Sequence, residues 1–305
     1  HGASRVVLAV PVAPDGWQQR IGAGADEFAS VSTPPNFFAI GQFYEDFSQT
    51  TDAEVTRLLT SAGTPPPVPA PRPERDRGDA KPVPSDLTAD EVPVEPIAGS
   101  TRLAGSLTVP TGPTGIVIFA HGSGSGRNSP RNRHVARVLS EAGLGTLLFD
   151  LLTPAEELHR ANVFDIPLLA GRLSDVTSWL RGQSLVPDAA IGYFGASTGA
   201  AAALWAAAEP GADIAAVVSR GGRPDLAGPR LAAVTAPTLL IVGELDTAVL
   251  DLNRRAQAGL RCDHDLAVVP GATHLFEEPG TLDAAAALAR DWFVRHLALR
   301  HHAAT

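Results

Sequence analysis

The stretch that decides the fold is Ile191-Gly192-Tyr193-Phe194-Gly195-Ala196-Ser197-Thr198-Gly199, and an alanine-rich segment at 200–208 follows it directly. Its first half is an apolar, strand-forming run, and its second half has the pattern GxSxG at the start of a predicted helix. A sharp strand-to-helix turn needs small neighbours, which Gly195 and Gly199 supply. Such a turn projects the Ser197 hydroxyl beyond the end of the strand. The stretch therefore predicts an exposed serine nucleophile.

A serine hydroxyl is a weak nucleophile near neutral pH, so this prediction requires a histidine base and a carboxylate later in the chain. Asp246 follows the apolar run 237–242, and His274 follows the apolar run 266–269. Both lie just past the end of a predicted strand, where open α/β sheets place their ligands. We expect Ser197 as nucleophile, His274 as general base and Asp246 as the acid that orients the imidazole. Glu244 is the alternative acid. Taken singly, Asp246 could be a helix cap and His274 an ordinary polar loop residue.

A glycine-rich loop, His121-Gly122-Ser123-Gly124-Ser125-Gly126, follows the apolar run 116–120. Its small residues leave the backbone N–H groups unobstructed, as a preformed oxyanion hole requires. We expect the backbone N–H groups of Ser123 and Thr198 to be the donors. A phosphate-binding loop is the alternative, but the order GxxxxGK[ST] is absent. We expect His121 to be a structural hydrogen-bonding residue and not a second base.

Several further residues could contact the substrate. Gly124 lies within the glycine-rich loop. Three residues after the loop could line the mouth of the site and meet an acidic substrate, or could lie solvated: Arg127, Asn128 and Arg133. Arg220 follows the apolar run 214–219 and therefore belongs to the same edge of the sheet. It is expected either to bind a substrate carboxylate or to pair with a loop acid such as Asp225.

Apolar strand-like runs alternate with helical stretches in the carboxy-terminal two-thirds of the chain. The predicted strands are 115–120, 145–149, 190–194, 214–219, 238–242 and 265–269, and the predicted helices are 133–142, 168–181, 198–208, 249–259 and 281–299. This alternation is typical of the α/β class, with a mostly parallel central sheet and helices on both faces.

Ten of the 26 prolines fall between Pro65 and Pro96, interleaved with charged residues. Such a segment cannot form a packed helix or an inner strand, so it is predicted to be a linker. The expected organisation is a short amino-terminal segment at 1–60, a proline-rich linker at 61–91 and an α/β domain at 92–300.

Composition excludes several classes of protein. The net charge is −9 and no basic stripe exists, so nucleic-acid binding is not expected. No apolar run approaches the roughly 20 residues that cross a bilayer, and residues 5–14 suggest a short buried strand and not a signal peptide, so a cytoplasmic location without membrane contact is expected. Because the chain has no methionine, its amino terminus is expected to be incomplete or tag-derived. The single cysteine, Cys262, indicates neither an internal disulfide nor a zinc site, and no metal is expected.

Four motifs together resemble the dienelactone hydrolase-like branch of the α/β-hydrolases over about residues 92–300: the loop 121–126, the turn 195–199, Gly243-Glu244-Leu245-Asp246 and Gly271-Ala272-Thr273-His274. The resemblance implies the α/β-hydrolase fold and an esterase or lactonase that uses acyl-enzyme chemistry on a small-molecule ester without a cofactor. Dienelactone hydrolases proper carry cysteine where this chain has Ser197, which favours a general carboxylesterase acting on short acyl chains. A non-catalytic binding module with the same fold is the alternative from another class.

The amino-terminal runs at 5–14 and 43–51 resemble the last part of a type I phosphoribosyltransferase. The portion of that family that cradles the sugar pyrophosphate, two acids and a Gly/Thr loop at a strand end, is missing. Transferase activity is therefore not expected. The remnant could fold over the hydrolase or form a homodimer contact.

Overall fold

The computed structural model describes residues 6–13, 16–21, 25–33, 91–183 and 189–303. The chain divides into two compact units, residues 1–81 and residues 82–305. The run 43–51 and residues 61–90 of the predicted linker lie outside the described residues.

The described part of the first unit is a β-α-β arrangement of β1 (Val7–Val12), α1 (Trp17–Ile21) and β2 (Glu27–Ser32). The two strands pair in parallel, and the Trp17 ring meets the edge of Phe28 at a centroid distance of 5.5 Å. The expectation of a strand at 5–14 is confirmed, but the expectation that it is buried is wrong, since Val7 is 53% exposed. Among the described residues each strand has a single neighbour, so alternate side chains of β1 face outward.

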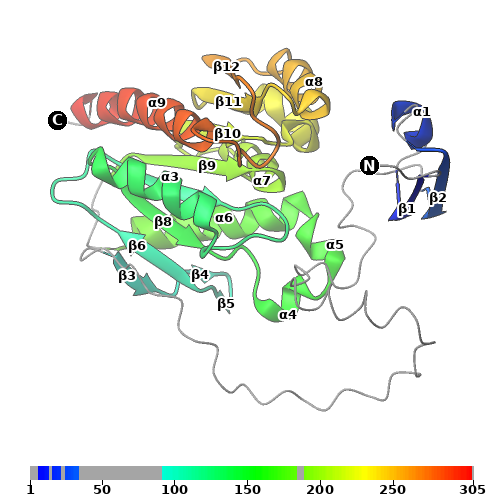
Figure 1. Ribbon diagram of the computed structural model, residues 1–305. Coiled ribbons are helices and arrows are strands. Elements are labelled where there is room, and N and C mark those ends of the chain that lie inside the picture. The colour runs from blue at the N-terminus through cyan, green and yellow to red at the C-terminus, as the bar shows by residue number, and fades with distance from the viewer. Residues whose placement is uncertain (1–5, 14–15, 22–24, 34–90, 184–188, 304–305) are drawn as a thin grey trace. The chain divides into compact units, whose positions relative to one another are not determined.

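The second unit contains an eight-stranded sheet of order β12-β11-β10-β9-β7-β8-β6-β3 (Figure 1). Its strands are β3 (Glu91–Val94), β6 (Gly105–Thr108), β7 (Ile116–Ala120), β8 (Gly145–Phe149), β9 (Ile191–Ala196), β10 (Ala216–Arg220), β11 (Thr238–Gly243) and β12 (His264–Val269). The six from β7 to β12 are parallel, whereas β6 and β3 join antiparallel at one edge. The predicted α/β class is confirmed. The sequence analysis missed β3 and β6, which are four residues long, and the two-residue hairpin strands β4 (Ile97–Ala98) and β5 (Thr101–Arg102).

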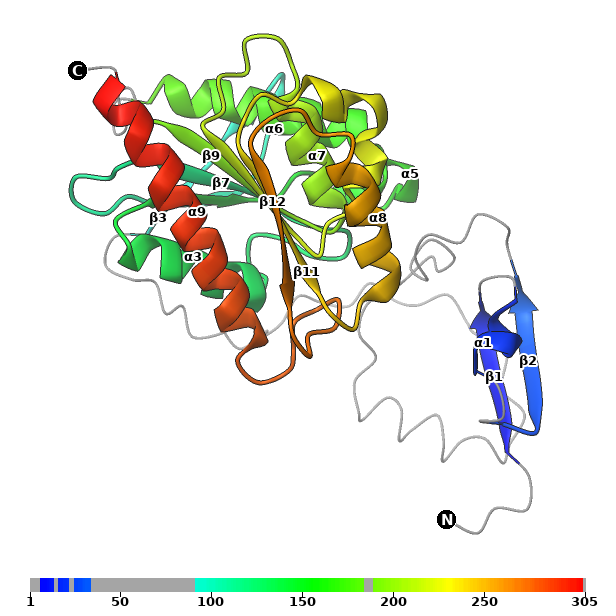
Figure 2. The same ribbon diagram turned by 90° about the horizontal axis from the view of Figure 1, so that it is seen from above.

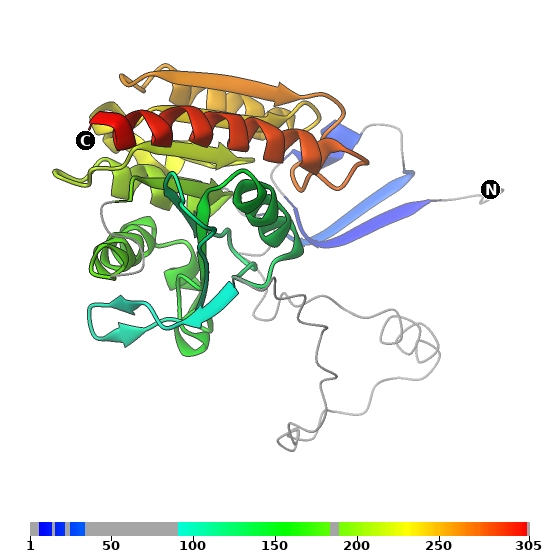
Figure 3. The same cartoon turned by 90° about the vertical axis from the view of Figure 1, so that its left-hand side faces the viewer.

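Helices cover both faces of this sheet. Their bounds are α3 (Pro130–Glu141), α4 (Pro154–Glu157), α5 (Arg160–Val163), α6 (Ile166–Arg181), α7 (Thr198–Ala207), the 3-10 segment η3 (Pro224–Ala233), α8 (Thr247–Gln257) and α9 (Thr281–Ala303). Buried side chains of α3 and α9 form one core with the sheet, and those of α6, α7 and α8 form the other. The views in Figures 2 and 3 show α9 lying lengthwise along its face. None of the described helices combines the length and apolar character that crossing a bilayer requires.

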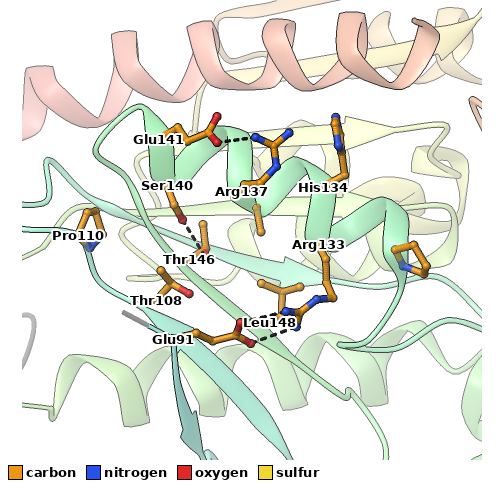
Figure 4. A pocket seen from close by; sticks show the side chains of 12 residues that line it. Glu91, Thr108, Pro110, Arg133, His134, Arg137, Ser140, Glu141, Thr146 and Leu148 are labelled. Carbon is orange, nitrogen blue, oxygen red and sulfur yellow. Dashed lines mark hydrogen bonds and ion pairs between the residues drawn. The ribbon is translucent and has the colours of Figure 1, made fainter. Parts of the chain in front are cut away.

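A cavity of about 530 Å³ lies between α3 and the strands β3, β6 and β8 (Figure 4). Its charged side chains are paired with one another: Arg133 binds the Glu91 carboxylate at 3.1 and 3.0 Å, and Arg137 pairs with Glu141. The cavity wall includes Thr146, at the amino end of β8, and the last turn of α3. The wall also includes Pro130, the first residue of α3, so the cavity runs along the whole helix. None of the residues that line it is Ser197, Asp246 or His274, so this cavity is not the candidate active site.

Candidate active site

Ser197 stands at the sharp turn between β9 and α7, where the sequence analysis placed it. Its φ of 51° and ψ of −122° are unusual for a residue with a side chain, so the turn is strained and is held by its surroundings. Gly195 and Gly199 explain how the turn fits: an added Cβ would lie 2.4 Å from the Ala200 Cα in the first case and 2.1 Å from the Ala120 carbonyl oxygen in the second. Any side chain at either position would force strand, loop and helix apart.

His274 and Asp246 meet although 28 residues separate them. The Nδ1 atom of His274 lies 2.6 Å from Oδ2 of Asp246, a distance typical of a strong hydrogen bond that involves a charged group. Asp246 begins α8, yet its side chain makes no capping hydrogen bond, so the helix-cap interpretation does not describe its role in the structure. Glu244, the alternative acid, instead accepts the Gly271 N–H at 2.8 Å. Because a carboxylate accepts, Nδ1 carries the proton, and Nε2 is left as the basic nitrogen.

The chain at the end of β10 contacts both Ser197 and His274. The Ser197 N–H donates to the Arg220 carbonyl oxygen at 3.4 Å. At the next residue, Gly221, an added Cβ would lie 3.6 Å from Cε1 of His274. The hydroxyl of Ser197 makes no hydrogen bond to any residue that the structure describes. Ser197, His274 and Asp246 therefore lie at one edge of the sheet. The hydrogen bond between His274 and Asp246 is formed, whereas a hydrogen bond between Ser197 and His274 is not.

The two predicted oxyanion donors also lie side by side. The Ser123 N–H donates to the Thr198 hydroxyl at 3.1 Å, and Thr198 is only 5% exposed. An added Cβ at Gly122 would lie 2.9 Å from the Ser197 Cβ, so this loop packs directly against the nucleophile turn. Within the described residues the Thr198 N–H donates to no backbone or side-chain acceptor. It is therefore the donor that is open to an incoming oxygen, while the Ser123 N–H is shared with the Thr198 side chain.

Two side chains hold the glycine-rich loop in shape. His121 is buried, its Nδ1 lies 2.9 Å from the Gly122 carbonyl oxygen, and its Nε2 accepts the Leu151 N–H at 3.0 Å. These partners make Nδ1 the protonated nitrogen, and burial lowers the pKa of His121 below its usual value. Arg127, a predicted substrate contact, forms an ion pair with Asp150 and donates its backbone N–H to the same carboxylate at 2.8 Å.

Asp150 was not singled out in the sequence, although it directly follows β8 and so lies at the functional edge of the sheet. Gly124, the other predicted contact in this loop, has a φ of 69° and open space around it.

Arg220 lies at the carboxyl end of β10, and its guanidinium lies between two aromatic rings. Its Cζ is 5.9 Å from the Phe194 ring centroid and 5.8 Å from that of Phe276. The expected alternative of a pair with Asp225 is wrong, because Asp225 takes two hydrogen bonds from Arg223, at 2.9 and 2.8 Å. Arg223 is two residues away in the same loop, so its guanidinium reaches the carboxylate in parallel alignment. The sequence analysis did not identify Phe276 as a neighbour of Arg220.

The second unit is similar in sequence and structure to proteins whose structures are known. A crystal structure of dienelactone hydrolase from Anabaena variabilis is 53% identical, with a TM-score of 0.66, and the match covers 68% of this chain and 97% of that chain. Est1E from Butyrivibrio proteoclasticus, 16% identical with a TM-score of 0.58 over 68% of this chain and 99% of its own, shares the fold. No protein-family model matches the sequence.

Two sequences from strains of Mycobacterium tuberculosis, both named "Putative phosphoribosyl transferase", are 56% identical over 301 residues. The match covers 97% of this chain but 65% of theirs, so the chain spans about two-thirds of the length of these relatives.

The second unit therefore has the α/β-hydrolase fold. Within that fold, the chain belongs to the dienelactone hydrolase family.

Proposed function

We propose that this chain is a serine carboxylic ester hydrolase that acts on short acyl esters or lactones through an acyl-enzyme intermediate. The observation that carries the proposal is the His274–Asp246 hydrogen bond of 2.6 Å beside the strained Ser197 turn. A structural histidine would not need a part-buried carboxylate on one nitrogen and a serine held at a positive φ nearby. Asp246 is 13% exposed at its side chain and His274 is 39% exposed, so the imidazole is open to a ligand while its acid is sheltered.

In this mechanism the Ser197 oxygen attacks the substrate carbonyl while Nε2 of His274 accepts the hydroxyl proton. Asp246 holds the imidazole in the required tautomer and stabilises the imidazolium that forms. His274 then returns the proton to the leaving alcohol, and water repeats the sequence to release the acid. The Ser197–His274 hydrogen bond must form when substrate binds, since catalytic hydrogen bonds are often long in substrate-free sites.

Negative charge that develops on the carbonyl oxygen needs donors that are already in place. The Thr198 N–H, at the amino end of α7, is one, and the Ser123 N–H is the second. In the substrate-free structure the Ser123 N–H donates to the Thr198 hydroxyl at 3.1 Å, so it must exchange this acceptor for the substrate oxygen when the ester binds.

The proposal of short acyl chains rests on the short segment between β8 and α6, which is the candidate cover of the site. Between β8 and α6 the described chain carries only the four-residue helices α4 and α5, and Glu156 ties this segment to Arg172 of α6 at 2.6 Å. A dienelactone-type lactonase is the second candidate, and the 53% identity to the Anabaena variabilis enzyme favours it. The serine at position 197, in place of the cysteine of dienelactone hydrolases proper, favours general esters.

The test is hydrolysis of p-nitrophenyl acetate and butyrate by the wild type and by Ser197→Ala. We expect kcat to fall by about 10³-fold or more in the variant, because the nucleophile is lost while the oxyanion donors remain. Ser178→Ala, an exposed serine of α6, is the matched control and should leave turnover unchanged. A fluorophosphonate probe should label the wild type and the control only. Turnover that survives in Ser197→Ala would remove Ser197 as the nucleophile. A wild type that reacts with neither ester nor probe would favour the non-catalytic module.

A further inference from the structure

A short segment between β10 and η3 holds the backbone of Ser197 from both sides. The Ser197 N–H donates to the Arg220 carbonyl oxygen at 3.4 Å, and the Arg223 N–H donates to the Ser197 carbonyl oxygen at 3.1 Å. We call residues 220–223 the bracing turn. Because Ser197 has a strained φ of 51°, these hydrogen bonds help to keep the nucleophile in a conformation that it would otherwise leave.

The bracing turn also lies against His274. An added Cβ at Gly221 would lie 3.1 Å from the His274 carbonyl oxygen and 3.6 Å from its Cε1. Gly221 itself has a φ of 52°, a conformation that favours glycine. The same turn therefore contacts the nucleophile and the general base. A displacement of the turn would move Ser197 and His274 relative to one another.

The middle of the bracing turn is tightly packed. An added Cβ at Gly222 would lie 2.0 Å from the Ser219 Oγ and 2.5 Å from the Ala200 Cβ, so the turn rests directly on β10 and α7. The carbonyl oxygen of Gly222 accepts a hydrogen bond of 3.0 Å from Nδ2 of Asn253, in α8. This bond connects the middle of the turn to a helix on the same face of the sheet.

Asn253 is fully buried, and its amide group is fixed by two acceptors. Nδ2 donates to the Gly222 carbonyl oxygen and, at 2.8 Å, to the Val249 carbonyl oxygen one helical turn back. Because both neighbours are acceptors, the nitrogen of the amide must face them. Oδ1 then has no hydrogen-bond partner in the described part of the chain. A buried oxygen without a partner is unfavourable, so packing alone does not explain an asparagine at this position.

The helix that carries Asn253 also carries the acid of the site. Asp246 is the cap residue of α8, and its carboxylate oxygen lies 2.6 Å from Nδ1 of His274. Among the described residues, Asn253 makes no hydrogen bond to Ser197, Asp246 or His274. Its bond to the bracing turn nevertheless joins the helix that begins at the acid to the segment that holds the nucleophile.

We propose that Asn253 is a positioning residue for hydrolysis, which acts by holding the bracing turn so that Ser197 stays aligned with His274. This role rests on the ester hydrolase function proposed above. A strained backbone persists only where its surroundings over-determine it, so loss of the Asn253 bond lets the turn and Ser197 relax together. The chemical step then suffers more than substrate binding, because a small misplacement of reacting groups lowers the rate steeply.

The first test is Asn253→Leu, which removes the donor but keeps a side chain of similar size. We expect kcat on p-nitrophenyl butyrate to fall by about tenfold or more while KM stays within about threefold of wild type. Rates are expressed per active site, counted by fluorophosphonate labelling taken to completion, so that unfolded protein does not contribute. An unchanged kcat per labelled site would overturn the proposal.

Thr177→Val is the matched control, because Thr177 has the same pattern of bonds. Its Oγ1 donates to the Leu173 carbonyl oxygen at 2.8 Å, one helical turn back, and lies 2.7 Å from Oη of Tyr193 in the sheet. This buried hydrogen bond does not involve the bracing turn, so its loss should change kcat by less than about twofold even if the melting temperature falls. Equal losses of kcat in both variants would contradict a specific role for Asn253.

The second test follows the bracing turn itself by hydrogen exchange, without substrate. In Asn253→Leu we expect the Ser197 and Arg223 amides, the two donors at the turn, to exchange about tenfold faster or more than in wild type. The Val217 amide, near the start of β10, should exchange at the wild-type rate. In Thr177→Val the Ser197 and Arg223 amides should be unchanged.

The two tests together separate the possible failures. A lower kcat with unchanged exchange would refute the route through the turn, and faster exchange with unchanged kcat would leave Asn253 a purely structural residue. If wild type cleaves no ester but the exchange difference appears, the proposed function and the catalytic role fail, while bracing of Ser197 by Asn253 stands.

A further variant covers poor folding of Asn253→Leu. In Asn253→Ser the hydroxyl can bond back to the Val249 carbonyl oxygen, as serine commonly does within helices, but the shorter side chain loses the bond to Gly222. Its kcat should fall and its Ser197 and Arg223 amides should exchange faster, as expected for the leucine variant. Wild-type values for both in a folded Asn253→Ser would refute the positioning role.

Discussion

At the scale of single residues, the choice between Asp246 and Glu244 decides how the histidine is oriented. Both acids follow β11, but only Asp246 contacts the imidazole, whereas Glu244 supports the backbone of the His274 loop at Gly271. The difference arises because the chain turns into α8 at Asp246, which moves its side chain toward the active edge.

Asp246→Asn should therefore lower kcat on p-nitrophenyl butyrate by about 10³- to 10⁴-fold, since an amide can present its N–H to Nδ1 and stabilise the wrong tautomer. Glu244→Gln keeps an oxygen that can accept the Gly271 N–H and should change kcat by less than about tenfold. Steady-state kinetics of the two variants checks this. The reverse ranking would show that Glu244 is the functional acid.

At the scale of elements, the nucleophile turn depends on how closely β7, β9 and α7 approach one another. Gly199 allows the first turn of α7 to touch the backbone that leaves β7, with no space for a methyl group. The obstacle is main chain, which cannot rotate away as a side chain can, so an alanine there must displace a helix or a strand.

Gly199→Ala should destabilise the protein by about 3 kcal/mol and lower kcat as well. Gly171→Ala is the matched control, because Gly171 lies within α6 with no atom near an added Cβ; it should be neutral or stabilising by roughly 0.5–1 kcal/mol. Urea unfolding measures both. Equal effects of the two substitutions would mean that the close approach at the turn is not what holds it.

At the scale of the whole molecule, each unit has its own internal contacts, and the proposed machinery lies entirely within residues 82–305. A chain of residues 82–305 should therefore fold alone and keep kcat/KM on p-nitrophenyl butyrate within about threefold of the full chain. Circular dichroism and kinetics of the two chains test this. A folded but inactive fragment would show that the first unit takes part in the reaction.

The Mycobacterium tuberculosis relatives are named as putative phosphoribosyl transferases, and the resemblance of this chain to such transferases lies in its first unit. Because the sequence lacks the two acids and the Gly/Thr loop that cradle the sugar pyrophosphate in phosphoribosyltransferases, it stays a prediction that this chain does not consume phosphoribosyl pyrophosphate.

Several features were determined by the sequence alone. Local hydrophobic periodicity predicted the six parallel strands and five principal helices to within a few residues, because buried strands and amphipathic helices leave direct traces in the order of residues. The position of Ser197 was also predictable, since GxSxG and its flanking strand and helix are contiguous in the chain. The short antiparallel strands β3 and β6 were not, because four residues show too little periodicity.

Other features were decided only by tertiary structure, because they depend on distances between segments far apart in the sequence. The preference of His274 for Asp246 and the hydrogen bond from the Ser123 N–H to Thr198 each required side chains to be placed in space. The isolation of Arg220 is the clearest case. The sequence indicated that Arg220 lies at the end of a strand, on the same edge of the sheet as Ser197. Whether its buried guanidinium has a hydrogen-bond partner depends on all the residues around it, which only the tertiary structure shows.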